Sequence, residues 1–175
     1  MENKVIIQTE RLIIREYSQA DLDDLYEILS DPETMKYYPK PYDRSGCQRW
    51  INWCLDSYEK NGFGLWAIEL KATGEFIGDC GISLQKIDGQ TLHEIGYHIN
   101  KKHWRQGYAK EACQAVKDWF FTNTPNGSVY SYMNADNIPS RATARSNVMT
   151  HIKTYTDGNE TLAVYEIIRE RWESL

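Results

Sequence analysis

Residues 101–110 read KKHWRQGYAK, and they are the most informative stretch of this sequence. It carries four formal positive charges and no acidic residue, in a chain whose net charge is −5. A strand-like segment, 94–99, precedes it and a helix-like segment, 108–121, follows. No Ser, Thr, Asp or Asn stands where the helix would be capped, so its first backbone N–H groups lack a side-chain partner. Free amides, a glycine, cations and the positive end of a helix dipole predict a binding site for phosphate or pyrophosphate.

The alternative is an exposed basic turn whose amides bond to water, because basic surface turns are common. The segment that follows favours the anion site. Its apolar residues recur at helical spacing: Ala109, Ala112, Cys113, Val116, Trp119 and Phe120. A helix with such a stripe is packed against a core. Its first turn is therefore held in place, as an anion site requires.

Length and composition are those of an ordinary globular protein. A chain of 175 residues suits one domain, 1–175, with a single core. Its pI near 5.4 argues against a general nucleic-acid partner. No apolar segment approaches the ~20 residues that span a bilayer, and no secretory signal is evident. We therefore expect a cytoplasmic protein with no nucleic-acid and no membrane partner.

The cysteine and histidine patterns predict no metal site. The cysteines form no C-x-x-C pair and are expected to be small buried hydrophobes in a reducing compartment: Cys47, Cys54, Cys80 and Cys113. His93 and His98 lie an odd number of residues apart on one predicted strand. Their side chains therefore face opposite sides of the sheet and cannot share a metal ion.

Strand and helix patterns alternate along the chain. We expect strands at 11–16, 65–70, 76–84, 93–99 and 129–133, with two more between 150 and 169. Helices are expected at 18–29, 45–59, 108–121 and 139–147. The chain contains no G-x-x-x-x-G-K-[ST] phosphate loop. The pair Gly62 and Gly64 also lacks the third glycine of a dinucleotide motif. A nucleotide-binding protein of another kind remains an alternative.

Two segments resemble motif A of the GNAT acetyltransferase superfamily: 94–97 (EIGY) and 104–112 (WRQGYAKEA). The family pattern is Gln/Arg-x-x-Gly-x-Gly/Ala, with Trp104 here in the first position. The segments 9–15 (TERLIIR) and 137–140 (NIPS) are similar to the RimJ/RimL-like branch, the ribosomal-protein N-terminal acetyltransferases. The resemblance covers nearly the whole chain in the right order.

The resemblance implies an α+β fold: a mixed, mostly antiparallel sheet of six to seven strands flanked by about four helices. A splayed strand pair would hold the cofactor. It also implies transfer of acetyl from acetyl-CoA directly to an amine, on a protein N-terminus or a small molecule, by a monomer or homodimer without a metal. The segment 144–149 (ARSNVM) departs from the branch, which has a glycine before the methionine. This departure leaves open a catalytically degenerate CoA-binding regulatory module.

The resemblance assigns cofactor contacts to particular residues. The pyrophosphate of acetyl-CoA would bind the backbone amides of Arg105, Gln106, Gly107, Tyr108, Ala109 and Lys110. Pantetheine would pair like an extra strand with the exposed backbone of His98, Ile99 and Asn100, whose amides would polarise the thioester carbonyl. Asn137 would contact the pantetheine arm.

Two side chains are candidates for catalysis. Glu94 is the acidic group nearest the motif and is a candidate base for the amine, unless it is a plain surface carboxylate. Many relatives protonate the leaving thiolate with a tyrosine on the helix at 139–147, but that helix contains none. Ser140 is the hydroxyl at the matching position, unless it only caps the helix. The aromatics Tyr37, Tyr38, Tyr42, Trp50 and Trp53 are expected to be core residues or to line the acceptor cleft.

Overall fold

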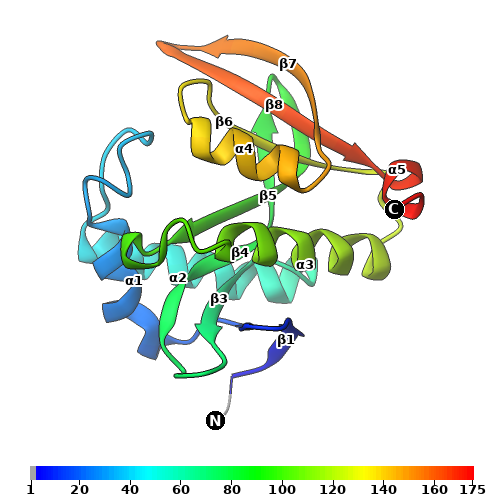
Figure 1. Cartoon of the computed structure of the whole chain (residues 1–175). Coiled ribbons are helices and arrows are strands. Elements are labelled where there is room, and N and C mark those ends of the chain that lie inside the picture. Colours follow the sequence, from blue (N-terminus) through cyan, green and yellow to red (C-terminus); the bar gives the residue numbers. More distant parts are fainter. Residues whose placement is uncertain (1–2) are drawn as a thin grey trace.

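The computed structural model describes residues 3–175 and places every strand of that range in one sheet (Figure 1). The strands are β1 (Val5–Gln8), β2 (Leu12–Arg15), β3 (Leu65–Leu70), β4 (Phe76–Ile87), β5 (Gln90–Ile99), β6 (Ser128–Asn134), β7 (Thr150–Asp157) and β8 (Glu160–Ile168). The helices are α1 (Leu22–Leu29), α2 (Arg44–Asn61), α3 (Tyr108–Asn123), α4 (Ile138–Ser146) and α5 (Arg169–Glu173). Short 3₁₀ turns at 19–21 and 101–103 precede α1 and α3.

The strand order is β1-β2-β3-β4-β5-β6-β8-β7, and only the β5–β6 pair is parallel. The predicted mixed, mostly antiparallel sheet is confirmed. The predicted numbers of strands and helices are too low, because the described range holds eight strands and five α-helices. The missed elements are β1 and α5, which are only four and five residues long. Segments this short contain too little periodic pattern to be detected.

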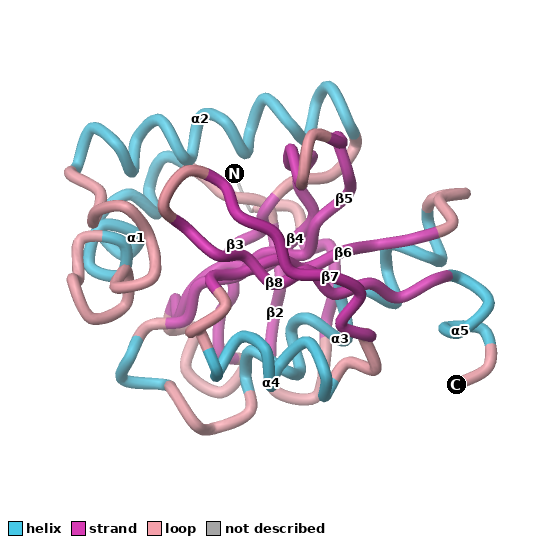
Figure 2. Tube along the Cα trace, turned by 90° about the horizontal axis from the view of Figure 1, so that it is seen from above, coloured by secondary structure: helices cyan, strands magenta, loops and turns pink. Residues whose placement is uncertain are grey.

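Helices cover both faces of the sheet (Figure 2). One layer is α1 and α2, whose core includes Leu25, Ile28 and Ile51. The other is α3 and α4, packed on a second core that includes Val116 and Phe120. Because β4 lies between the layers, its first eight residues are buried in succession rather than alternately. Within residues 3–175, no helix is both long and apolar enough to cross a membrane.

The parallel strands β5 and β6 meet only over a short distance. Their recorded register contains a single pair, Glu94 with Tyr130, and the Ser131 hydroxyl donates to the Ile95 carbonyl at 3.0 Å. Beyond this point β5 continues along β4, β6 continues along β8, and the two strands diverge (Figure 1). The predicted splayed pair is therefore present. The gap opens toward the start of α3.

Candidate active site

The start of α3 has the uncapped geometry that the sequence predicts. Gly107 precedes the helix in the left-handed region, with φ 82°, and no side chain caps the first turn. The backbone N–H groups of residues 105–110 donate to no protein acceptor within the described range. Arg105 is also left-handed, with φ 60°, which is uncommon for a residue other than glycine. The turn thus leaves consecutive amides free at the positive end of a helix dipole.

The connection between β1 and β2 holds this turn in place. The Glu111 carboxylate, in the first turn of α3, accepts hydrogen bonds from the Thr9 hydroxyl at 2.6 Å and from Arg11 Nε at 2.6 Å. Arg11 Nη1 donates to the Gln106 carbonyl at 2.8 Å, and its guanidinium lies 4.3 Å from the centre of the Tyr108 ring. The segment 9–12 (TERL) therefore holds the turn that carries the free amides in place, through contacts from outside α3.

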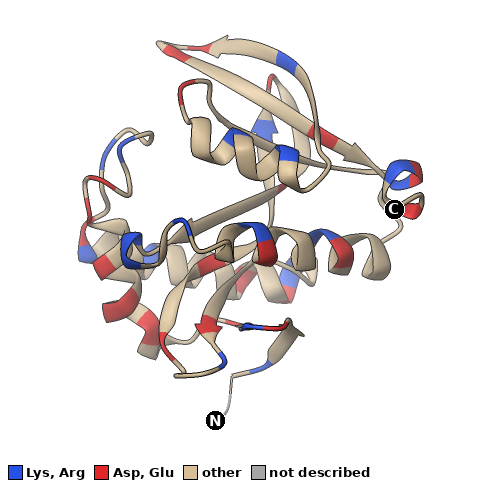
Figure 3. Ribbon diagram, viewed as in Figure 1, with Lys and Arg blue, Asp and Glu red and all other residues tan. Residues whose placement is uncertain are grey.

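Much of the positive charge before α3 is neutralised. Three groups each contact a carboxylate: Lys101 Nζ with Asp31 Oδ1 at 2.8 Å, Lys102 Nζ with Glu27 Oε1 at 2.5 Å, and His103 Nε2 with Glu75 Oε1 at 3.0 Å. Basic and acidic segments meet beside α1, which contains Glu27 and ends just before Asp31 (Figure 3). Within residues 3–175, no carboxylate forms an ion pair with Arg105 or Lys110. These two cations remain for an anionic ligand.

Two adjoining cavities lie along the gap between β5 and β6. The outer cavity, of about 710 Å³, lies beside the start of α3 and is lined by Arg105, Gly107, Ala109 and Lys110 among others. The inner cavity, of about 380 Å³, includes Glu94. Both are lined by Tyr38, Tyr97, His98, Asn137, Ser140 and Thr143. A ligand extending from α3 into the gap would therefore reach the inner cavity.

Alternation along β5 determines which backbone groups face the gap. The Ile95 carbonyl faces β6, because it accepts the hydrogen bond from the Ser131 hydroxyl. Residues two apart in a strand point their N–H and C=O groups the same way, so those of Tyr97 and the N–H of Ile99 also face the gap. Ile99 is a predicted cofactor residue. Tyr97 was not predicted and joins it here.

The backbone amides of His98 and Asn100 are not available to a ligand. The His98 N–H donates to Asp79 Oδ1 at 3.0 Å, and the Asn100 N–H donates to the Ile77 carbonyl at 2.7 Å. Both groups thus face β4 rather than the gap. The prediction that these two amides pair with pantetheine is wrong, because it took three consecutive residues where a strand exposes every second one.

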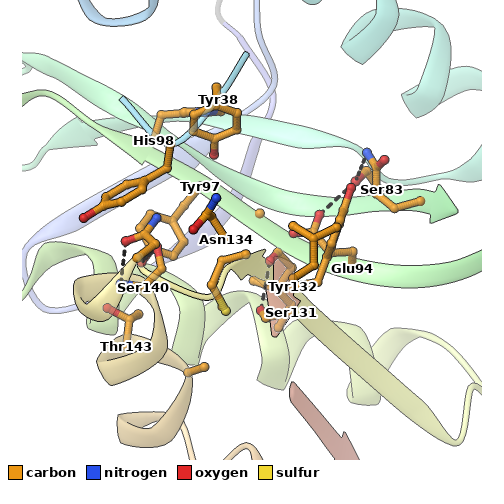
Figure 4. A pocket seen from close by; sticks show the side chains of 18 of the residues that line it. Tyr38, Ser83, Glu94, Tyr97, His98, Ser131, Tyr132, Asn134, Ser140 and Thr143 are labelled. Atoms are coloured by element: carbon orange, nitrogen blue, oxygen red, sulfur yellow. Dashed lines mark hydrogen bonds between the residues drawn. The ribbon is translucent and has the colours of Figure 1, made fainter. Parts of the chain in front are cut away.

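Glu94 lies at the end of the inner cavity opposite His98 and Tyr38 (Figure 4). Its carboxyl accepts a hydrogen bond from the Ser83 hydroxyl at 3.2 Å. It also leans over Gly96, where an added Cβ would stand 3.0 Å from Glu94 Oε2. Burial raises the pKa of Glu94 to about 8, and the Ser83 hydrogen bond offsets this only in part. Glu94 is therefore not a plain surface carboxylate but a group that titrates near neutral pH.

Ser140 forms part of a hydroxyl pair and does not cap its helix. The cap of α4 is Asn137, whose side chain accepts the hydrogen bond of the Ser140 N–H at 3.2 Å. The Ser140 Oγ lies 3.1 Å from the Tyr97 hydroxyl (Figure 4). Burial raises the pKa of Tyr97 to about 12, which keeps its phenol protonated at neutral pH. A tyrosine hydroxyl is thus present, but it comes from β5 rather than from α4.

The sequence profile of the acetyltransferase (GNAT) domain matches residues 11–150, which contain both cavities' principal residues. The chain belongs to the GNAT acetyltransferase family. It is an acetyl-CoA-dependent N-acetyltransferase.

Three known proteins that are similar to this GNAT chain match nearly all of it. YkkB, an uncharacterized protein of Bacillus subtilis (strain 168), is 36% identical over 95% of this chain and 97% of its own. The crystal structure of an acetyltransferase from Agrobacterium tumefaciens str. C58 is 27% identical, with a TM-score of 0.80 over 95% of this chain and 98% of that one. RimL, a ribosomal L7/L12 alpha-N-protein acetyltransferase solved with CoA, shares the fold at 16% identity, with a TM-score of 0.78 over 96% and 99%.

Most of the predicted aromatic residues line the GNAT inner cavity. Tyr37, Tyr38, Tyr42 and Trp50 are all in its wall. Trp53 is not. Its ring packs on that of Trp50, with 5.2 Å between centroids. The predicted cleft between the first helices and the sheet is therefore present, and four of the five aromatics belong to it.

The atypical segment 144–149 still ends α4 in the expected way. Val148 adopts the left-handed conformation, with φ 65°, that glycine would adopt most easily. The buried Lys117 ammonium donates to the Asn147 carbonyl at 3.0 Å and holds the turn from α3. Met149 is buried and lines the inner cavity. The missing glycine therefore strains the backbone without removing the cavity wall.

The cysteines and the acidic groups add no second kind of chemistry. All four cysteines are buried and none forms a disulfide, although the Sγ atoms of Cys80 and Cys113 lie 3.9 Å apart and Cys113 lines the inner cavity. Burial raises the pKa of the Cys47 thiol to about 11, which makes it a poor nucleophile. In the described part of the chain, no cluster of three or more His, Cys, Asp or Glu side chains is arranged to hold a metal ion.

Proposed function

We propose that this enzyme transfers the acetyl group of acetyl-CoA directly to a cationic amine bound in the inner cavity. The proposal rests mainly on the position of one carboxyl group. Glu94, whose carboxyl titrates near neutral pH, lies in a cavity that adjoins the outer cavity at the uncapped start of α3. The outer cavity suits an anionic cofactor and the inner one suits an amine.

The residues along the gap fit acetyl-CoA, which would supply an activated acetyl thioester. The free N–H groups of residues 105–110, with Arg105 and Lys110, would hold the pyrophosphate. The gap-facing backbone of Tyr97 and Ile99 would pair with the pantetheine arm. Asn137 lines both cavities, and its side-chain NH₂ remains free for the arm while its oxygen caps α4.

Glu94 would accept a proton from the amine, and the hydroxyl pair of Ser140 and Tyr97 would donate one to the thiolate. An amine attacks only after losing its positive charge, and Glu94 would take that proton. The departing thiolate needs a proton, which Ser140 would donate while Tyr97 replenishes it through their hydrogen bond. Solvent would then return a proton to Tyr97 and take the one held by Glu94. Both hydroxyls are in the walls of the two cavities, where the acetyl group would meet the amine.

The wall of the inner cavity favours a positively charged acceptor. Its carboxylates are Glu94, Asp157 and Glu160, whereas Lys86 is its only Lys or Arg among the described residues. Aromatic rings, including Tyr38, Trp50, Tyr132 and Tyr155, complete the wall and attract cations through their π-faces. The small volume suits a polyamine, an amino sugar or the first residues of a peptide.

An acceptor screen tests this proposal. Thiol release from acetyl-CoA would be measured with spermine, kanamycin, a serine-initiated hexapeptide and its N-blocked form. We expect turnover with at least one free amine and none with the blocked peptide. CoA binding without thiol release for every acceptor would favour the regulatory module. Stabilisation by ATP equal to that by CoA in a thermal-shift comparison would favour a nucleotide-binding protein.

The domain organisation, the branch of the family, the cellular location and the state of assembly remain predictions. The continuous sheet supports a single N-acetyltransferase domain over 1–175. The segments TERL and NIPS support the RimJ/RimL-like branch, since both take part in the site. A cytoplasmic location rests on the sequence alone, and so does assembly as a monomer or homodimer.

A further inference from the structure

His98 and Glu94 share one face of β5. They are four residues apart, and side chains at even spacing in a strand point the same way. Gly96 lies between them and carries no side chain, and the Glu94 carboxyl leans over it. Both side chains line the inner cavity (Figure 4). The cavity therefore has two proton-accepting groups along one wall.

Asp79 on β4 fixes the orientation of the His98 ring. Its carboxylate is fully buried and receives four donors: the Tyr17 hydroxyl at 2.8 Å, Trp50 Nε1 at 3.0 Å, the His98 N–H at 3.0 Å and His98 Nδ1 at 2.9 Å. Four donors fill the lone-pair sites of a carboxylate. Because Asp79 can only accept, the Nδ1 of His98 must carry the proton. In the neutral imidazole, the other ring nitrogen, Nε2, then presents a lone pair.

That lone pair has no partner within the described protein. His98 Nε2 is buried and makes no hydrogen bond, and the whole residue is only 8% exposed. Its ring lies between Tyr38, at 5.3 Å, and Trp50, at 5.5 Å between centroids. Buried polar atoms are normally satisfied, and His98 lines both cavities, so its unpartnered Nε2 points to a donor supplied by a bound ligand.

The reaction needs a second proton acceptor. When an ammonium becomes an amide, its nitrogen gains one bond to carbon and loses two protons, while the carbon–sulfur bond breaks. One of the two protons balances the thiolate and the other leaves to solvent. Glu94 accounts for the proton lost before attack. A single carboxyl that already holds that proton cannot take the next one.

We propose that His98 accepts the proton that the amine nitrogen loses as the new carbon–nitrogen bond forms, with Asp79 as its positioning residue. The proton moves from the nitrogen to Nε2, and the resulting imidazolium lies against the Asp79 carboxylate, which stabilises it. His98 then releases the proton to solvent through the outer cavity, whose wall it also forms. This assignment rests on the acceptor cavity proposed above.

Two variants separate this role from a structural one. His98→Asn keeps an amide near Nδ1 to donate to Asp79 but removes Nε2. Asp79→Asn keeps the shape but removes the negative charge that would stabilise the His98 imidazolium. We expect each to lower kcat for spermine about 100-fold while KM and CoA affinity stay unchanged. His151→Asn, at an exposed histidine bonded to Thr154, is the matched control and should be fully active.

Hydroxylamine distinguishes His98 from Glu94, because its nitrogen is already uncharged at neutral pH. With this small nucleophile, Glu94→Gln should lose little activity, whereas His98→Asn should keep its full defect. Unchanged kcat in His98→Asn for both nucleophiles would overturn the proposal. So would equal recovery of both variants with hydroxylamine.

A measurement without turnover completes the test. Long-range ¹H–¹⁵N spectra of the labelled protein report which nitrogen of each histidine carries the proton. We expect Nδ1–H and an unprotonated Nε2 for His98 in the wild type, and a cooperative melting transition would confirm that each variant is folded. A wild-type proton on Nε2 would overturn the proposal. If no nucleophile supports thiol release, the proposed function fails, while these spectra still decide the state of His98.

Discussion

The two halves of the site are built in different ways. The outer half, at the start of α3, consists largely of backbone N–H groups from one continuous segment, 105–110. The inner half consists mainly of side chains from strands β4 to β8, helices α2 and α4 and the loop after α1, with Glu94 and His98 on one strand face. The first depends on local conformation and the second on register between distant segments. Substitutions should therefore affect the two halves through different mechanisms.

The largest expected effect is loss of cofactor binding in Gly107→Glu. The new side chain would meet the braced Arg11 guanidinium and set a negative charge among amides that await an anion. We expect no measurable CoA binding by calorimetry, with an unchanged far-UV CD spectrum. Gly89→Glu is the matched control, because Gly89 has φ 81° but open space around it, at the β4–β5 turn. Equal CoA affinity in Gly107→Glu and the wild type would contradict the backbone site.

Next in size is the effect of Glu94→Gln on turnover. Because the pKa of Glu94 is raised to about 8, its carboxyl is largely protonated at pH 7, and wild-type kcat should rise with pH through that value. The variant should be about 100-fold slower at pH 7.5. Its deficit should shrink at high pH, where the amine is already neutral. A pH–rate profile checks this, and a constant deficit at every pH would make Glu94 a binding group instead.

A smaller loss is expected for Ser140→Ala. If Ser140 donates the proton to the thiolate, its removal should slow transfer about tenfold, with unchanged CoA affinity. Tyr97→Phe should give a similar loss, and the double variant should be no slower than either single one, since the hydroxyls act in series. Full activity of Ser140→Ala would remove the hydroxyl pair from the mechanism.

The raised pKa of Glu94 also predicts that the stability of the folded protein depends on pH. A folded pKa near 8 lies above the ordinary value of 4.5, so the folded state loses stability as pH rises from the lower to the higher value. Glu94→Gln removes this loss and should be more stable than the wild type at pH 9, by up to about 5 kcal/mol, and equally stable at pH 4. Urea unfolding at both pH values measures it. An equal difference at both would mean that the gain is unrelated to ionisation.

The smallest effect concerns Val148, outside the proton path. A β-branched residue at φ 65° is strained, so Val148→Gly should stabilise the protein by about 0.5–1 kcal/mol, after the added freedom of the unfolded chain is subtracted. Thermal unfolding measures the gain, and kcat should be unchanged. Lower stability would show that the packing of the valine side chain outweighs the strain.

The contrast between the halves also explains what the sequence could predict. The free amides of the outer half follow from residues next to one another: a glycine, no capping side chain and an apolar helix. Glu94 was predicted for the same reason, since it lies close to the motif. The roles of Asp79 and Tyr97 depend on alternation and on pairing with β4 and α4, which a single sequence does not contain. The pairing of Lys101 and Lys102 with acids around α1 was missed because it joins segments about 70 residues apart.

Amide chemical shifts during a CoA titration test whether the backbone amides at the start of α3 bind the cofactor. In ¹H–¹⁵N spectra of the ¹⁵N-labelled protein, we expect the largest chemical-shift changes at residues 105–110, followed by Tyr97 and Ile99. The amide shifts of His98 and Asn100, which face β4, should change little. Saturable CoA binding that leaves residues 105–110 unshifted, and moves amides elsewhere, would contradict this prediction.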